Sequence, residues 1–293
     1  FSSKTEGEID YTHPKFALGV QEPTRVRILG DHSGYHCGGA AVFSALHEAA
    51  RAKVWSVVSQ REEYDVLVVN GEGTMHNGSK GFHRKMGVLA KAVEAGVPAF
   101  LVNSVWQNNP SDYDSVLRKL SGITVRESLS RDDLKNRHGI EPNVAIDASF
   151  FAQVEARPGL PVFAGKVAYT DFWEPGQRWV TNPEVVRDGV FLSLKDLTWS
   201  ETVNSLRVSS LLVTGRHHAV YAACRARKIF AALDGNTHKI RGIGKDAGID
   251  IPIARSADDL KSLASDIHRC SEEFSALFDW MAGQDRSSIF PSL

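Results

Sequence analysis

The chain has 293 residues, of which 42% are hydrophobic and 24% charged, and its formal net charge is -1. This length can bury the cores of two domains, and the balanced charge excludes nucleic acid or an anionic membrane surface as the main partner. No apolar run reaches the roughly 18 residues of a membrane span. Three cysteines without a CxxC pair favour a reducing, cytoplasmic location. The sequence begins at Phe1 with a polar stretch, so we expect residues 1–24 to be an arm and the chain to be part of a longer protein.

Short β-branched runs alternate with helical patterns through the first half of the chain. The expected strands are 26–29, 65–69, 99–102, 123–125 and 144–146. A helix around 42–49 follows a glycine-rich turn at 34–39, and a second helix around 86–93 ends before Pro98. Strands that alternate with helices predict βαβ units in a parallel sheet that is buried on both faces.

A second α/β half follows the linker-like stretch 157–161. Its expected strands are 167–169, 190–194, 210–214 and 229–233, and its expected helices are 200–208, 219–227, 258–268 and 271–281. The sequence therefore predicts an α/β fold with two Rossmann-like domains, 25–156 and 157–293, and a cleft between them.

Polar residues follow the first two strands of the N-terminal half, at the sheet edge where ligands bind. The first strand leads into a loop that contains Asp31 and Gly38. Its glycines suit an anion that approaches backbone N–H groups, or simply a tight turn into a helix. The second strand ends at Glu72, beside Gly73. A buried carboxylate is costly without a partner or a task, so Glu72 is expected to act on a hydroxyl or to accept backbone N–H bonds.

Arg126 closes another strand of this half. A guanidinium in this place is a natural clamp for a carboxylate or a phosphate. A purely structural pair with Glu127 or Asp147 is the alternative.

The richest strand exit is the segment 214–219, where Arg216, His217 and His218 follow an apolar run. The arginine offers a bidentate fork, and a histidine offers a proton near neutral pH. A core histidine next to a surface arginine is the alternative interpretation. The loop at 234–239 adds three polar side chains, which either bind a ligand or cap a helix: Asn236, His238 and Lys239.

Eleven histidines raise the question of a metal site. His217 and His218 are adjacent, and His32 and His36 share one loop. The chain has no H-E-x-x-H segment and no paired cysteine spacing. We therefore expect neither a metal nor another cofactor.

Three segments together resemble the polysaccharide pyruvyltransferase family: 65–74, which ends in NGEGT, 124–147, which begins TVRES, and TGRHHA at 214–219. The resemblance covers roughly residues 26–254. It implies a fold like that of GT-B glycosyltransferases, phosphoenolpyruvate as the donor and a sugar diol as the acceptor, in cell-surface polysaccharide synthesis. Phosphate leaves and a pyruvate ketal forms. Carried over by motif, Arg126, Arg216 and His218 contact the donor.

For this reaction we expect His218 to act as the general acid and Glu72 or Asp31 as the base. The residues expected to bind the substrates are Arg126, Arg216, His217, Asn236, His238, Lys239, Gly38 and Gly73. This sequence departs from the family at His217, where an apolar residue is usual. A glycosyltransferase that uses a nucleotide-activated sugar such as CMP-Kdo is the first alternative, and a non-catalytic sugar-binding module is the second.

Overall fold

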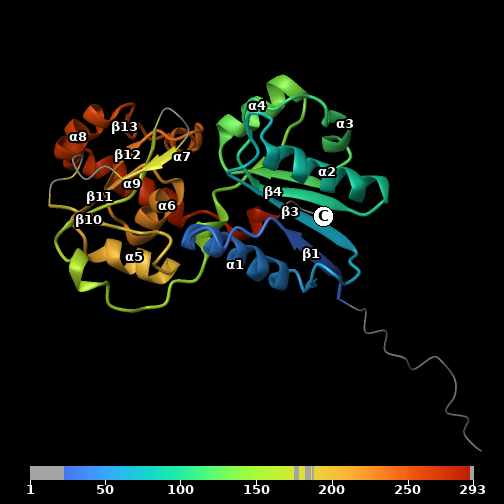
Figure 1. The fold of residues 1–293 in the computed structure, drawn as a ribbon, viewed down its shortest axis with the longest axis horizontal. Coiled ribbons are helices and arrows are strands. Elements are labelled where there is room, and N and C mark those ends of the chain that lie inside the picture. Colours follow the sequence, from blue (N-terminus) through green and yellow to red (C-terminus); the bar gives the residue numbers. More distant parts are fainter. Residues whose placement is uncertain (1–22, 175–177, 182–185, 187, 291–293) are drawn as a thin grey trace, which may run out of the picture.

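The computed structural model describes residues 23–174, 178–181, 186 and 188–290. Two parallel sheets, each flanked by helices, form two lobes that lie side by side (Figure 1). The expected arm at 1–24 lies outside the described residues except for its last two positions. Within the described ranges, no helix has both the length and the apolar character that crossing a membrane requires.

The N-terminal lobe is built on a six-stranded parallel sheet in the order β2-β1-β3-β4-β5-β6. Its strands are β1 (Arg25–Leu29), β2 (Ser56–Val57), β3 (Val66–Glu72), β4 (Ala99–Ser104), β5 (Gly122–Val125) and β6 (Asn143–Val144). Its helices are α1 (Cys37–Ala52), α2 (Lys80–Glu94), α3 (Asp114–Leu117), α4 (Ser128–His138) and the 3-10 helix η2 (Ala148–Phe151). Strands β3 and β4 are buried along their whole length, as expected for central strands of a parallel sheet with both faces covered.

The C-terminal lobe is built on a five-stranded parallel sheet in the order β10-β7-β11-β12-β13. Its strands are β7 (Val167–Tyr169), β10 (Val190–Phe191), β11 (Leu211–Thr214), β12 (Phe230–Leu233) and β13 (Ile253–Ala254), and β8 (Phe172–Glu174) pairs antiparallel with β9 (Arg178–Val180). Its helices are α5 (Trp199–Val208), α6 (His217–Ala226), α7 (Lys239–Ala247), α8 (Ala257–Asp266) and α9 (Ser271–Ala282), with 3-10 helices η3 (Pro161–Phe163), η5 (Ile267–Cys270) and η6 (Arg286–Ile289).

The predicted fold class is confirmed, and several element boundaries need correction. Helix α1 begins at Cys37, so Gly38 lies in its first turn and not in the preceding loop. The reason is a cap: His36 has extended backbone, and its side chain accepts a hydrogen bond from the N–H of Gly39. The strands predicted at 144–146 and 190–194 end earlier, at Val144 and Phe191.

The last described residues of the chain return to the N-terminal lobe (Figure 1). Helix η6 packs against α1 and η2, and the ring of Phe290 lies 5.5 Å from that of Trp55. The hydroxyl of Thr124 donates to the carbonyl of Ile289 at 3.1 Å. Residues 286–290 therefore pack on the first lobe, although the predicted boundary places them in the second domain.

The strand orders explain where a ligand can bind. In the first sheet the order reverses between β1 and β3, and in the second it reverses between β7 and β11. Parallel sheets open a crevice at the carboxyl ends of strands on either side of such a reversal. The residues at these four ends include His32, Glu72, Asp171 and Arg216.

Candidate functional site

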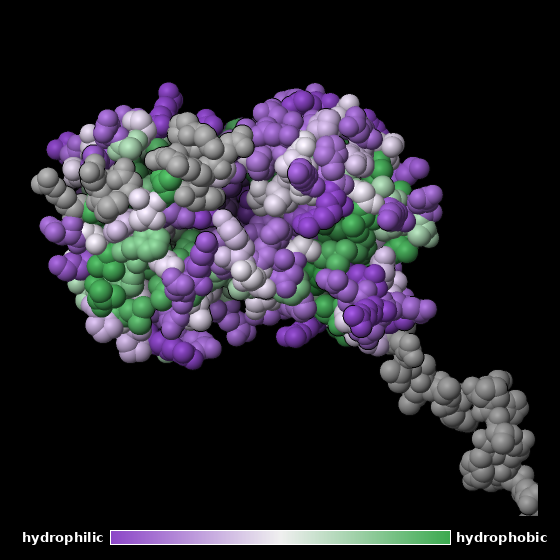
Figure 2. Space-filling view, in the orientation of Figure 1, coloured by the Kyte–Doolittle hydropathy of each residue, from purple (hydrophilic) through white to green (hydrophobic). Residues whose placement is uncertain are grey.

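A pocket of about 160 Å³ receives residues from both lobes. The surface around the junction of the two lobes is largely hydrophilic (Figure 2). The pocket is lined by His32, Tyr35, His36, Glu72, Gly73, Thr74, Arg126, Arg216, His217, His218, Asn236 and Lys239. All four polar strand exits identified in the sequence, and the late loop, thus contribute to one pocket.

Glu72 is the last residue of β3, and its side chain is almost completely buried. Its backbone has φ of +46°, a left-handed conformation that costs energy in a non-glycine residue and is often found at functional sites. Asn70 Nδ2 donates to its carboxylate at 3.3 Å. Burial raises the pKa of Glu72 to about 7, so the carboxyl carries a proton for much of the time at neutral pH.

Arg126 is buried against Asp147, with Nη1 2.5 Å from the Oδ2 atom of the carboxylate. Burial alone would raise the pKa of Asp147, but Arg126 outweighs it and holds that pKa well below its ordinary value. The structural pair of Arg126 with Asp147, which was the alternative interpretation of the sequence, is therefore present. Arg126 also lines the pocket, and no partner within the described part of the chain satisfies its Nε.

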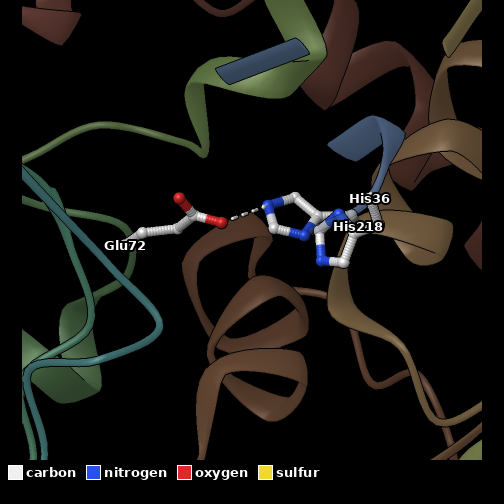
Figure 3. Close-up of side chains that lie close together, drawn as sticks. All are labelled: His36, Glu72 and His218. Atoms are coloured by element: carbon white, nitrogen blue, oxygen red, sulfur yellow. Dashed lines mark ion pairs between the residues drawn. The ribbon is translucent and has the colours of Figure 1, made fainter. Parts of the chain in front are cut away.

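His217 and His218 begin helix α6 behind this pair. His218 Nε2 lies 3.8 Å from Glu72 and 3.7 Å from Asp147, and His217 Nε2 lies 3.4 Å from Asp147. Figure 3 shows the carboxylate of Glu72 directed at the ring of His218, with His36 beside it. Burial lowers the pKa of His217 to about 4 and that of His218 well below its ordinary value. Burial thus favours the neutral form of both groups, a protonated Glu72 and an uncharged His218, whereas the sequence analysis expects His218 to be the acid and Glu72 or Asp31 the base.

Lowering the pH from about 7 to about 5 is expected to destabilise the fold. Burial lowers the pKa values of His32, His36 and His217 to about 4, from 6.5. A lowered pKa gives stability that is present above 6.5 and lost as the pH falls toward 4, at up to about 1.4 kcal/mol per pH unit for each histidine. Chemical unfolding at several pH values measures this slope. His36→Asn keeps a capping oxygen and should flatten the slope, whereas an equal slope in both proteins would contradict this account.

Arg216 is held by both lobes. Its Nε and Nη2 contact the carboxylate of Asp171 at 2.6 and 2.5 Å, and its Nη1 donates to the hydroxyl of Tyr35 at 3.2 Å. Asp171 and Tyr35 are not among the predicted site residues, although Asp171 follows the predicted strand 167–169 and Tyr35 lies in the predicted turn 34–39. The fork of Arg216 is thereby fixed at the rim of the pocket.

Lys239 is the first residue of α7, and its side chain is buried in the pocket. Its Nζ donates to Asn236 Oδ1 at 2.8 Å, and burial lowers its pKa to about 7. Atoms of Lys239 and Arg126 both lie close to Gly73, since a Cβ at Gly73 would lie 4.0 Å from Lys239 Nζ and 3.8 Å from Arg126 Nη2. The side chains of Arg126 and Lys239 thus both border the space that Gly73, which has no side chain, leaves open.

Three predicted site residues lie elsewhere. Asp31 is exposed and accepts from the N–H of Ser33 at 2.8 Å, in a turn beside a neighbouring cavity and not in the pocket. His238 lies outside the pocket lining and pairs with Glu127 at 3.2 Å. Gly38 packs behind His218, where a Cβ would meet the histidine Cβ at 2.5 Å. Gly38 thus gives room for the histidine, which explains why a glycine is needed there without direct substrate contact.

His36, Glu72 and His218 have possible ligand atoms within 4.8 Å of one another. A metal ion needs a free lone pair on each nitrogen. His36 Nδ1 already accepts from the N–H of Gly39 at 3.0 Å, which puts the ring hydrogen on Nε2. Arg126 and Lys239 add positive charge nearby. This set therefore suits an anionic ligand better than a metal ion.

Comparison with known proteins places the chain by fold. No family model matches it, and no curated protein matches its sequence. The S. aureus MnaA–UDP structure is 11% identical over 91% of this chain and 93% of its own, with a TM-score of 0.63. A putative UDP-N-acetylglucosamine 2-epimerase from Listeria monocytogenes is 11% identical over 90% of this chain and 92% of its own, with a TM-score of 0.56. These similarities support the GT-B-like arrangement of two Rossmann-like domains.

Proposed function

We propose that the protein transfers the pyruvyl group of phosphoenolpyruvate to a saccharide diol. The observation that carries the proposal is the cationic pocket itself. Arg126, Lys239 and Arg216 line a small cavity, and within the described residues the buried nitrogens Arg126 Nε and His218 Nε2 have no hydrogen-bond partner. A compact donor with a carboxylate and a phosphate would satisfy such groups.

The size of the pocket supports a small donor. Its volume is about 160 Å³, whereas drug-sized ligands, a class that includes nucleotide sugars, occupy sites of about 300–1,000 Å³. Beside four histidines, Tyr35 is the large aromatic side chain that lines the pocket, which leaves little surface for stacking a nucleobase. Phosphoenolpyruvate needs no such surface.

The protonation of the pair Glu72 and His218 fits a balanced two-step reaction. Protonated Glu72 gives its proton to the methylene carbon of the donor, and the first hydroxyl of the acceptor adds to the adjacent carbon as its own proton passes to Glu72. The bond from that carbon to the phosphate oxygen then breaks, and the second hydroxyl adds. His218 carries the proton of that hydroxyl to the departing phosphate. The methyl group and the phosphate each end with one added proton, so no proton comes from outside.

Transfer of a sugar from a nucleotide donor is the second candidate. It is favoured by the similarity of the fold to a structure that contains UDP. In that case Arg216 and Lys239 would hold the donor phosphates and Glu72 would act on the acceptor. The pocket alone is too small for such a donor, which would also need the adjoining cavity of about 460 Å³ that shares Tyr35 and His36 with it.

Thermal unfolding with a panel of ligands separates the candidates. A ligand that binds the folded state at about 100 times its Kd stabilises it by about 2.7 kcal/mol. We expect phosphoenolpyruvate to raise the melting temperature and CMP, UDP and GDP to leave it unchanged. Stabilisation by a nucleotide and not by phosphoenolpyruvate would contradict pyruvyl transfer and favour sugar transfer from a nucleotide donor.

Gly73→Ala is expected to block the donor without harming the fold. The new methyl group would meet Arg126 and Lys239 only at ordinary contact distances, and Gly73 does not have positive φ. It would nevertheless occupy space in the pocket. We expect phosphoenolpyruvate affinity to fall by about tenfold, roughly 1.4 kcal/mol, as measured by calorimetry. Gly87→Ala, where a Cβ meets nothing within 4 Å, is the matched control and should bind normally.

A further inference from the structure

A lysine lies buried beneath the turn that carries Glu72. Lys85 comes from helix α2 and is 4% exposed, yet it does not line the donor pocket. Its Nζ donates to the carbonyl of Gly71 at 2.7 Å and to the hydroxyl of Thr74 at 2.8 Å. These two atoms belong to residues on either side of Glu72 in the chain. The amine therefore ties together the turn whose left-handed residue is Glu72.

His32 lies between this amine and the carboxylate of Glu72. Its Nε2 is 3.2 Å from Lys85 Nζ and 3.9 Å from Glu72 Oε2. Burial, with the charge of Lys85, lowers the pKa of His32 to about 4, so the neutral ring can accept a hydrogen bond from the amine at Nε2. Burial lowers the pKa of Lys85 to about 7, and in its charged form the amine has an acceptor for each of its three hydrogens: Gly71, Thr74 and His32.

The polar contacts lead from Glu72 to a second cavity. This cavity has a volume of about 270 Å³ and includes His32 and Lys85 in its lining, together with Arg84 and Gln60. His32 is the residue that lines both cavities. A charge on Lys85 consequently acts on Glu72 from outside the donor pocket, and a donor that fills the pocket would not displace it.

The charged and titratable groups around Glu72 come from several elements. They are Lys85 from α2, His32 from the loop after β1, His36 before α1, Arg126 from the end of β5, Asp147 before η2, His218 from α6 and Lys239 from α7. Arg126 is already paired with Asp147, and Lys239 faces the donor. Burial raises the pKa of Glu72, and the charges of Arg126 and, to a smaller extent, Lys85 oppose it, so Lys85 helps to offset the charge that appears when Glu72 gives up its proton.

We propose that Lys85 is a positioning residue that, with His32, holds Glu72 in place and stabilises its carboxylate from behind after each proton transfer. This inference rests on the proposed function only in the step that Glu72 performs. The contacts of Lys85 with Gly71, Thr74 and His32 hold whatever the donor is. A purely structural lysine would tie the turn but would leave the titration of Glu72 unchanged.

The test compares Lys85→Met with Lys85→Arg, and uses Lys91→Met, an exposed lysine of the same helix, as the control. Infrared difference spectra of each protein against its Glu72→Gln partner follow the protonation of Glu72 with pH. Lys85→Met lacks the positive charge that lowers the pKa of Glu72 against the effect of burial. Glu72 should therefore titrate at a pH about one unit or more higher in this variant. Lys85→Arg and Lys91→Met should titrate within a few tenths of a unit of the wild type. Equal titration in all three variants would overturn the inference.

Calorimetry of phosphoenolpyruvate binding against pH gives a second, independent measurement. An ionised Glu72 repels the anionic donor, and Lys239 loses its charge over the same range, so the affinity should fall as the pH rises through about 7. The midpoint of that fall should move upward in Lys85→Met, in the same direction as the infrared midpoint. An unmoved midpoint would defeat the inference. An infrared shift in a protein that binds no phosphoenolpyruvate at any pH would support the role of Lys85 and defeat the proposed function. If Lys85→Met does not fold, His32→Asn serves as the test variant, because it removes the ring that lies between Lys85 and Glu72. Both midpoints should then shift in His32→Asn. Unmoved midpoints in that variant would equally defeat the inference.

Discussion

Lys239→Met is expected to weaken phosphoenolpyruvate binding by about 10- to 100-fold while making the folded protein more stable. The amine is buried, and burial lowers its pKa to about 7 from 10.5. A lowered pKa means that the folded state disfavours the charged amine, and this cost grows as the pH falls toward 7. Methionine fills the same space without a charge. We therefore expect the free energy of unfolding to rise by roughly 0.5–2 kcal/mol.

The loss of binding has a separate cause. A hydrogen bond from a charged group is worth about 1.5–3 kcal/mol, which corresponds to the expected change in affinity. Lys245→Met removes an exposed lysine from the same helix, where it pairs with Asp132 at 2.7 Å. That exposed pair should contribute no more than about 1 kcal/mol, and its loss should leave binding intact. Chemical unfolding and calorimetry of the two variants check both parts. A Lys239→Met protein that is less stable and binds normally would show that the lysine is structural.

Arg126→Met is expected to cost about 3–5 kcal/mol of stability, because it leaves the buried carboxylate of Asp147 without its main partner. The second change Asp147→Asn removes that charge and keeps an oxygen that can accept from the N–H of Ser149, as Asp147 does at 2.9 Å. The double variant should therefore regain much of the lost stability. It should still fail to bind phosphoenolpyruvate, since the cationic clamp is gone.

A double-mutant cycle by urea unfolding measures this coupling. The two single changes should be strongly non-additive, because the residues touch within one buried network. Additive losses would mean that the pair is not the stabilising unit described here. Recovery of binding in the double variant would remove Arg126 from the donor site.

The convergence of the strand exits was predictable from the sequence. Glu72, Arg126 and Arg216 each follow an apolar strand, and parallel strands end at one edge of a sheet. That rule brings Glu72 and Arg126 together at the first sheet, whereas Arg216 follows a strand of the second sheet and meets them across the cleft between the two domains. The structure adds their ionisation: burial leaves the proton on Glu72 and removes it from His218, which residue type alone does not indicate.

Other features depend on contacts that no local pattern contains. Asp171 and Tyr35 reach Arg216 from distant segments, and the short helix η6 has too few residues for any periodicity to show that it returns to the first lobe. The position of Lys85 in the sequence does carry a signal. It lies on the buried face of α2 with Phe82, Met86 and Leu89, where a lysine is out of place unless it has a polar partner.

The most direct test of the central claim follows the bond that breaks. Phosphoenolpyruvate with isotopically heavy oxygen in the bridge between carbon and phosphorus is incubated with the protein and a set of saccharides that carry free diols. Pyruvyl transfer breaks the carbon–oxygen bond, so we expect phosphorus NMR to detect released phosphate that keeps the heavy oxygen. Release should require a diol and be absent with Glu72→Gln. Phosphate without the heavy oxygen, or no release while a nucleotide sugar is consumed, would contradict the account.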